Sequence, residues 1–147
     1  MITHSNISPI LRFACRSAAR IIQVFGVYVI VHGHYSPGGG FQGGALLAAA
    51  VFLLRIGEGR EHSQRDMPSR VTLLLGSIGV LVYGAVGLLT IATGGRFLDY
   101  DAVPLPGLSL DDRHYWAILV IELAVGLAVM AILVGIFDRL LQRFHHD

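Results

Sequence analysis

Charged residues are scarce in this sequence, and cysteine is almost missing. Only 14% of the 147 residues are Asp, Glu, Lys or Arg, against about 25% in an ordinary soluble domain. The single cysteine, Cys15, excludes an intrachain disulfide. A formal net charge of +1 gives no concentrated basic face, so nucleic acid is not an expected partner. What is present is a chain that is 54% hydrophobic, with its charges clustered between long uncharged runs.

Two runs of the sequence are long and apolar enough to cross a lipid bilayer. Residues 71–92 carry no charge, and residues 115–137 carry one, at Glu122. At about 1.5 Å per residue, a helix over either run spans the ~30 Å hydrocarbon core. A soluble helical bundle would need a polar face on each helix, and neither run has one of useful width. Both runs therefore predict transmembrane helices.

Two more spans are expected upstream, although their ends are less apolar. Residues 14–34 reach bilayer length with Arg16 and Arg20 in the first turns, from which long side chains reach the headgroups. A helix over residues 37–57 starts well, because Ser36 can cap it and Pro37 is tolerated at its first position. The sequence thus predicts an all-α integral membrane protein, one four-helix domain over residues 1–147, with spans at about 14–34, 37–57, 71–92 and 115–137.

The arginines predict how these spans are oriented, because short loops rich in arginine stay in the cytoplasm. Only Arg96 and Arg113 lie in the loops that follow the first and third spans. The other nine lie before the first span, between the second and third, or after the fourth: Arg12, Arg16, Arg20, Arg55, Arg60, Arg65, Arg70, Arg139 and Arg143. We therefore expect both termini in the cytoplasm.

Rows of small residues predict close contacts between the helices, as such rows let membrane helices approach each other. They recur four apart in the second span and along one side of the fourth: Gly39 with Gly43, Gly40 with Gly44, then Ala124, Ala128, Ala131 and Gly135. At about 100° per residue, Glu122 points almost opposite the row in its own span. If that row packs inside the protein, Glu122 faces outward, toward a partner protein or a water-filled crevice.

Several polar groups are expected in the outer third of the membrane. His32 and His34 end the first span, while Gln42 and Glu122 lie roughly 10 Å inside the second and fourth. A carboxylate in apolar surroundings beside titratable imidazoles has the chemistry of a proton or cation relay. Two alternatives stay open: the histidines could be interfacial hydrogen-bonding residues, and Glu122 could be a structural contact to another subunit.

No enzymatic constellation is present in the sequence. It has no paired-cysteine or HExxH metal signature and no phosphate-binding loop. The glycine-rich stretch 33–44 joins two membrane spans, and that context excludes a nucleotide cradle. We therefore expect no catalytic residue, no metal site and no cofactor.

The same stretch carries a family resemblance. Residues 33–44 read GHYSPGGGFQGG and match a pattern of GH, two variable positions and PGGGFQGG throughout. This pattern resembles the signature of the B subunit of Mrp-type (Mnh) multisubunit sodium/proton antiporters. Chain length, the number of spans and the position of the motif also fit. The positions that the resemblance marks are His34, Pro37, Gly38, Gly39, Gly40, Phe41, Gln42, Gly43 and Gly44. Glu122 is inferred from its physical setting alone.

The resemblance implies an accessory, non-enzymatic subunit of a secondary antiporter that exchanges sodium ions for protons across a prokaryotic plasma membrane. Its implied partners are the other subunits of the complex, including large subunits that resemble the membrane arm of respiratory complex I. Its implied contribution is to assembly, with a further role in the ion pathway as an expectation.

Three alternatives remain open at this point. The first is the equivalent subunit of a membrane-bound hydrogenase-like or complex-I-like ion-pumping complex. The second is a stand-alone four-helix exporter, a type that usually carries its essential carboxylate in the first span, where this chain has only Gln23. The third is a purely structural scaffold with no polar role in transport.

Overall fold

Four long helices account for most of the structure. The computed structural model describes residues 8–33, 35, 38–58, 68–104, 107 and 109–143. The long helices are α1 (Pro9–Val31), α2 (Gly40–Glu58), α4 (Ser69–Ala92) and α5 (Leu110–Arg143), and a short 3-10 helix, η1, covers Tyr100–Ala102. The described residues contain no strand. Each long helix is long and apolar enough to cross a membrane, which confirms the predicted all-α membrane fold.

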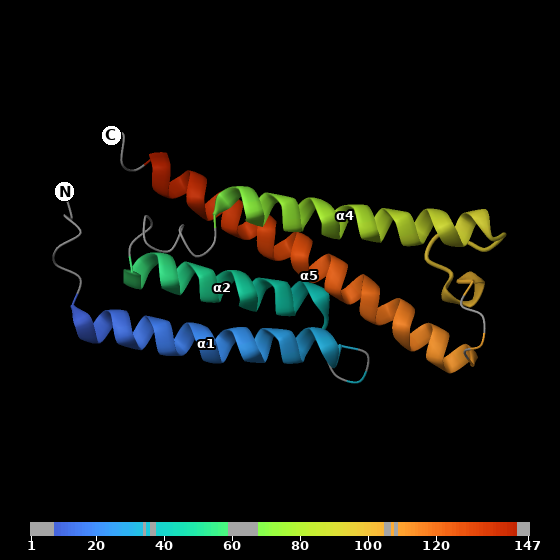
Figure 1. Ribbon diagram of the computed structural model, residues 1–147, viewed down its shortest axis with the longest axis horizontal. Coiled ribbons are helices and arrows are strands. Elements are labelled where there is room, and N and C mark those ends of the chain that lie inside the picture. The colour runs from blue at the N-terminus through green and yellow to red at the C-terminus, as the bar shows by residue number, and fades with distance from the viewer. Residues whose placement is uncertain are drawn as a thin grey trace.

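The helices form a row rather than a closed bundle. α1 packs on α2, α2 packs on α5, and α5 packs on α4, while α1 and α4 lie on opposite sides of the molecule (Figure 1). The helices run lengthwise across Figure 1. The start of α1, the end of α2, the start of α4 and the end of α5 all lie at the same end of the molecule's long axis (Figure 1). α2 and α5 therefore each have two packed faces, whereas the outer faces of α1 and α4 are open.

The second helix begins later than expected. α2 starts at Gly40 instead of Pro37, because Gly39 has a φ of +136°, which no right-handed helix accommodates. The first intrahelical hydrogen bond runs from the Gly43 N–H to the Gly39 carbonyl at 2.9 Å. Ser36 and Pro37, the expected cap and first residue, lie outside the described residues.

The last helix is longer at both ends than the run 115–137. It starts at Leu110 because Ser109 caps it, with the Ser109 hydroxyl accepting a hydrogen bond from the Asp112 N–H at 3.2 Å. Asp111 and Asp112 then lie in the first turn, where the helix dipole favours negative charge. At the other end the helix continues past residue 137, so that Asp138 is part of it.

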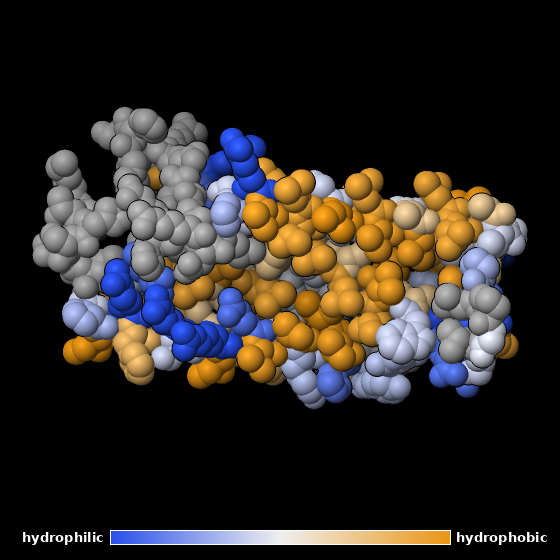
Figure 2. All heavy atoms as spheres, in the orientation of Figure 1, coloured by the Kyte–Doolittle hydropathy of each residue, from blue (hydrophilic) through white to orange (hydrophobic). Residues whose placement is uncertain are grey.

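Large apolar side chains cover the outside of the row. Phe13, Val24 and Leu81 are 74%, 72% and 70% exposed. Figure 2 shows a broad apolar surface along the length of the helices, with hydrophilic side chains mostly toward the two ends. In water such a surface would be unstable, but lipid is the solvent that suits it. The buried hydrophobic cluster between α2 and α5 is small: Ala48, Val51, Met130 and Val134.

Glycine contacts bring α2 close to both of its neighbours. Gly43 lies against the Gly26 carbonyl oxygen and Ile30 of α1. Gly44 lies against α5, where a Cβ on Gly44 would come within 2.5 Å of the Gly126 carbonyl oxygen. Since that atom belongs to the backbone, it cannot move aside as a flexible side chain would. The contact between α2 and α5 therefore requires glycine at position 44.

We predict that Gly44→Leu separates α2 from α5 and lowers the recovery of folded chain. Overpacking at this contact should destabilise the folded protein by about 1–3 kcal/mol or more. The matched control is Gly84→Leu on α4, because a Cβ at Gly84 meets nothing within 4 Å. Recovery of folded chain from detergent-extracted membranes, measured on a native gel, compares the two. Equal recovery of both variants would contradict the packing.

Candidate functional site

The start of α2 leaves a backbone donor that the helix itself cannot satisfy. Because the first intrahelical bond is made by the Gly43 N–H, the Gly40 N–H has no acceptor inside the helix. Both Gly39 and Gly40 are buried. A buried N–H in a membrane protein must find an acceptor within the protein, since no water is available in the hydrocarbon region.

Glu122, in the middle of α5, supplies this acceptor. The Gly40 N–H donates a hydrogen bond to Glu122 Oε2. A Cβ at Gly39 would lie 2.7 Å from the same oxygen, and one at Gly33 would lie 3.3 Å from Glu122 Cδ. We call these residues, Gly33, Gly39, Gly40 and Glu122, the glycine–carboxylate site. A carboxylate at the amino end of a helix is also favoured by the helix dipole.

The expectation that Glu122 faces outward is wrong. The small residues opposite Glu122 do pack inside the protein, since Ala124 and Ala131 lie against Gly79 and Gly76 of α4. The error lies in giving α5 only one packed face. Because α5 is an inner member of the row, its other face, with Glu122, packs on α2. No partner protein or water-filled crevice is needed to hold the carboxylate.

The remaining motif residues are spread over several surroundings. Gly38 lies beside Val29 of α1, and Phe41 and Gln42 are exposed. His32 is also exposed; its ring stacks on Tyr28 with centroids 4.1 Å apart, and its Nδ1 lies 3.2 Å from the Tyr28 carbonyl oxygen. His34 and Pro37 lie outside the described residues. The structure therefore brings the glycines and Glu122 together, but not His32 or Gln42.

Sequence reasoning missed two titratable groups, Tyr100 of η1, which lies near Glu122, and His114 of α5. His114 Nε2 lies 2.9 Å from Asp101 Oδ1, and the His114 ring meets Tyr100 edge-on at 6.3 Å. Burial raises the pKa of the Tyr100 phenol, and the nearby Tyr83 and Glu122 raise this pKa further. Tyr100 thus stays a neutral hydroxyl near both His114 and Glu122. The sequence feature that could have indicated these groups is His114, which lies eight residues before Glu122 on the same helix.

A second polar cluster, also missed, lies at the opposite end of the helices. Arg55 Nε lies 2.8 Å from Asp138 Oδ1, and these side chains are only 0% and 6% exposed. Ser69 Oγ donates to Asp138 Oδ2 at 2.9 Å, and Arg16 Nε donates to Glu58 Oε1 at 2.6 Å. We call these five residues the inner ion cluster. It connects α1, α2, α5 and α4 in that order.

The two polar clusters are separated by an apolar layer. Asp138 lies sixteen positions after Glu122 in α5, which corresponds to about 24 Å along the helix. The intervening side chains between α2 and α5 are the small apolar core of Ala48, Val51, Met130 and Val134. Within this core, among the residues that the structure describes, no side chain offers a polar ligand between the two clusters.

Comparison with known proteins identifies a family. Residues 10–135 match the model of a family described as a domain related to the MnhB subunit of Na+/H+ antiporter. This is the family that residues 33–44 resemble, and that prediction is confirmed. Together with the four apolar helices, the match makes the chain a multi-pass protein of a prokaryotic plasma membrane, as expected from the sequence.

Individual relatives include an archaeal and a bacterial protein. The chain is 30% identical over 129 residues to the uncharacterized protein MJ1307 of Methanocaldococcus jannaschii, covering 84% of this chain and 48% of the relative. It is 28% identical over 127 residues to a Staphylococcus aureus protein provisionally named antiporter subunit mnhB2, covering 86% of this chain and 89% of that one. The chain therefore spans about half of the archaeal relative and most of the bacterial one.

A solved structure has a similar fold. A chain of the membrane-bound sulfane sulfur reductase (MBS), described as an archaeal respiratory membrane complex, matches with a TM-score of 0.71 and 28% identity. The match covers 95% of this chain and 60% of that chain.

The inner ion cluster generates a stability prediction. Asp138→Leu removes this carboxylate from beside the buried Arg55 guanidinium, which we expect to cost about 3–5 kcal/mol. The double variant Arg55→Met with Asp138→Leu removes both charges and should recover most of this loss, because an apolar pair fits a buried site well. Thermal unfolding of the purified protein in detergent measures both variants. A single variant as stable as the unmodified protein would show that the pair does not hold the helices together.

Proposed function

The chain belongs to the family of domains related to the MnhB subunit of Na+/H+ antiporters, and from this membership we propose that it is an accessory membrane subunit of a multisubunit monovalent cation/proton antiporter. Its role is non-enzymatic: it is a subunit of a secondary antiporter, and other subunits of the complex are its partners. Sodium ions and protons are the transported species.

The glycine–carboxylate site carries this proposal. Glu122 is the one acidic residue of the run 115–137, and it lies against the stretch 33–44 that resembles the family signature. The motif's glycines leave room for a carboxylate at membrane depth and supply a backbone donor to it. Such a carboxylate is costly in lipid and typical of ion and proton pathways. We infer that Glu122 contributes a proton-binding or charged group on the outer side of the exchange route.

The apolar layer inside the chain supports an accessory role over that of a complete transporter. Ions crossing between the two polar clusters would have to pass side chains such as Val51 and Met130, which offer no ligand. A continuous route in this proposal therefore needs groups from neighbouring subunits. The proposed arrangement is one four-helix membrane domain over residues 1–147 with both termini in the cytoplasm, because nine of the eleven arginines belong to that side.

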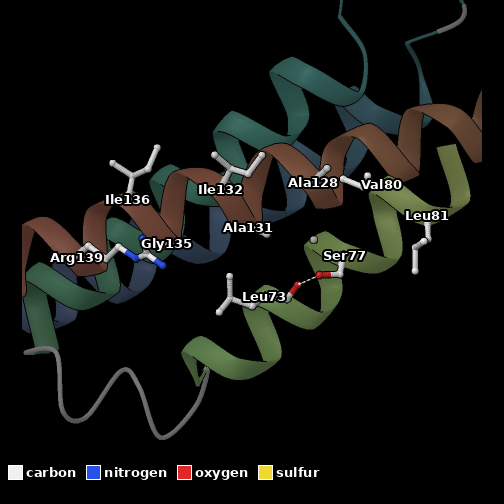
Figure 3. Close-up of a pocket in the computed structure, with 11 residues that line it drawn as sticks. Leu73, Ser77, Val80, Leu81, Ala128, Ala131, Ile132, Gly135, Ile136 and Arg139 are labelled. Atoms are coloured by element: carbon white, nitrogen blue, oxygen red, sulfur yellow. Dashed lines mark hydrogen bonds between the residues drawn. The ribbon is translucent and has the colours of Figure 1, made fainter. Parts of the chain in front are cut away.

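Docking of a neighbouring subunit has a candidate surface between α4 and α5. A groove of about 570 Å³ is lined there by apolar side chains and by Arg139 at one end. Ala131 and Gly135 of α5 lie between Ile132 and Ile136 of the same helix and Leu73 of α4 (Figure 3). We propose that an apolar transmembrane helix of a neighbouring subunit occupies it, with a carboxylate or its carboxyl end facing Arg139.

Two observations favour this occupant. Small residues in a groove let a second helix approach closely, which is how membrane helices associate. The one hydroxyl in the groove, Ser77 Oγ, already donates to the Leu73 carbonyl at 2.9 Å (Figure 3). The groove therefore offers an incoming helix packing rather than hydrogen bonds, and the charge of Arg139 sets the partner's orientation.

A second candidate function is the equivalent subunit of a redox-driven ion-pumping complex. The observation that favours it is the likeness to a chain of the MBS respiratory complex, with a TM-score of 0.71 at 28% identity. The two candidates share the same fold and the same Glu122 site. They differ in the proteins that surround the chain, so the partners decide between them.

We predict that Glu122→Gln lowers cation/proton exchange much more than it lowers assembly. Glutamine keeps an oxygen that can accept the Gly40 hydrogen bond but loses the charge and the proton. We expect exchange per assembled complex, measured in everted membrane vesicles, to fall by about a hundredfold, the lower end of what removing a proton-transfer group costs.

Glu122→Leu is the matched control, because it removes the acceptor as well and should reduce assembly too. Exchange by the Glu122→Gln complex at the unmodified rate would contradict an ion-pathway role and leave a structural scaffold.

We also predict that Gly135→Leu weakens association with the neighbouring subunit without disturbing this chain. A Cβ at Gly135 meets nothing within 4 Å, so the leucine fills the groove rather than clashing inside the protein. The expected loss is about 1–3 kcal/mol of association, read as less partner recovered with the tagged chain. Gly84→Leu, also in open space but outside the groove, should recover partner normally. Normal recovery with both variants would exclude the groove as a docking surface.

A further inference from the structure

α1 and α2 together line a polar cavity that the proposed function does not use. It lies between α1 and α2 near the arginine-rich end, has a volume of about 330 Å³ and is lined by Arg16, Ala19, Arg20, Gln23, Leu54 and Glu58. Figure 2 shows hydrophilic side chains gathered over α1 and α2 toward this end, beside the apolar surface. The cavity therefore sits where polar and apolar surfaces meet.

The charge of this cavity favours an anion. Glu58 forms an ion pair with Arg16, in which Arg16 Nε and Glu58 Oε1 are 2.6 Å apart. Arg20 is exposed, and no ion pair or hydrogen bond of its side chain is found among the described residues. Among the residues that line the cavity, two guanidinium groups against one carboxylate leave a net charge of +1. Gln23 adds a half-buried amide that can donate to an oxygen.

An apolar furrow continues directly from this cavity along α1. It has a volume of about 510 Å³ and is lined by Arg20, Ile21, Val24, Phe25 and Tyr28. Arg20 thus belongs to both hollows. From Arg20 to Tyr28 the furrow follows eight residues, or about 12 Å of helix, close to the ~15 Å depth of one leaflet's hydrocarbon.

The furrow suits an acyl chain better than a helix. Its lining contains bulky side chains such as Val24 and Phe25, which are 72% and 54% exposed. It lacks the glycine and alanine that let a second helix approach closely. This distinguishes it from the groove between α4 and α5, which has small residues along its length.

We propose that these two hollows form a binding site for one anionic phospholipid. The Arg20 guanidinium holds the phosphate through paired N–H donors, a geometry that suits phosphate oxygens. The Gln23 amide lies deeper, at the level of the lipid's ester groups, and one acyl chain lies along Ile21, Val24, Phe25 and Tyr28. Basic pockets at the cytoplasmic ends of membrane helices recognise anionic headgroups in this way. The site is independent of whether the complex is an antiporter.

Spin-labelled lipids test the proposal on the purified complex in phosphatidylcholine vesicles. We expect labelled phosphatidylglycerol to associate in preference to labelled phosphatidylcholine. Arg20→Gln should reduce that preference about fivefold, the factor that one arginine near an anionic surface contributes. Arg70→Gln is the control, because Arg70 is an exposed arginine at the same end of the protein that lines neither hollow.

The preference must fall in Arg20→Gln and stay unchanged in Arg70→Gln. Equal losses in both variants would show a general surface-charge effect and overturn the site, as would equal association of the two labelled lipids with the unmodified complex. A photoreactive side chain in place of Val24 gives a second readout. Crosslinking to phospholipid supports the site, and crosslinking to another protein subunit overturns it.

Discussion

The structure depends on one backbone group for which its own helix has no acceptor, the Gly40 N–H at the start of α2. No water reaches such a group in the hydrocarbon region, so the acceptor must come from the protein. Glu122 provides it across the α2–α5 contact. The hydrogen bond is possible only if the two backbones come close, and glycine at positions 39, 40 and 44 makes that approach possible. The family motif is thus explained physically: its glycines make room for a carboxylate that satisfies the helix they begin.

The rest of the chain reinforces this contact and limits what the chain can do alone. At the far end of the helices, the inner ion cluster connects all four members of the row through Arg16, Glu58, Arg55, Asp138 and Ser69. Between the two polar regions lies an apolar layer about 24 Å deep. The four helices have an apolar core and, on one face, a groove of small residues. Such a row is suited to being one member of a larger assembly. In the proposed function, the Glu122 carboxylate acts together with groups from neighbouring subunits.

Sequence reasoning predicted the elements well and their faces poorly. Uncharged runs such as 71–92 predict membrane helices because the bilayer imposes length and hydrophobicity directly. The orientation of Glu122 was wrong because periodicity shows which residues share a face, not how many faces are packed; that depends on the order of helices in the row. Asp138 was missed because the predicted last span ended at residue 137, just before the next charged residue. His114 was missed because α5 extends outward to Leu110, which brings the imidazole onto the same helix as Glu122.

We propose that this chain works as a subunit of an antiporter assembly. The most direct measurement is a pull-down of the tagged chain in mild detergent, with mass spectrometry of the proteins that accompany it. We expect large complex-I-like antiporter subunits without metal-centre subunits. Iron–sulfur or hydrogenase-type subunits would assign the chain to a respiratory complex like the MBS relative. A chain that is recovered only with copies of itself would contradict both.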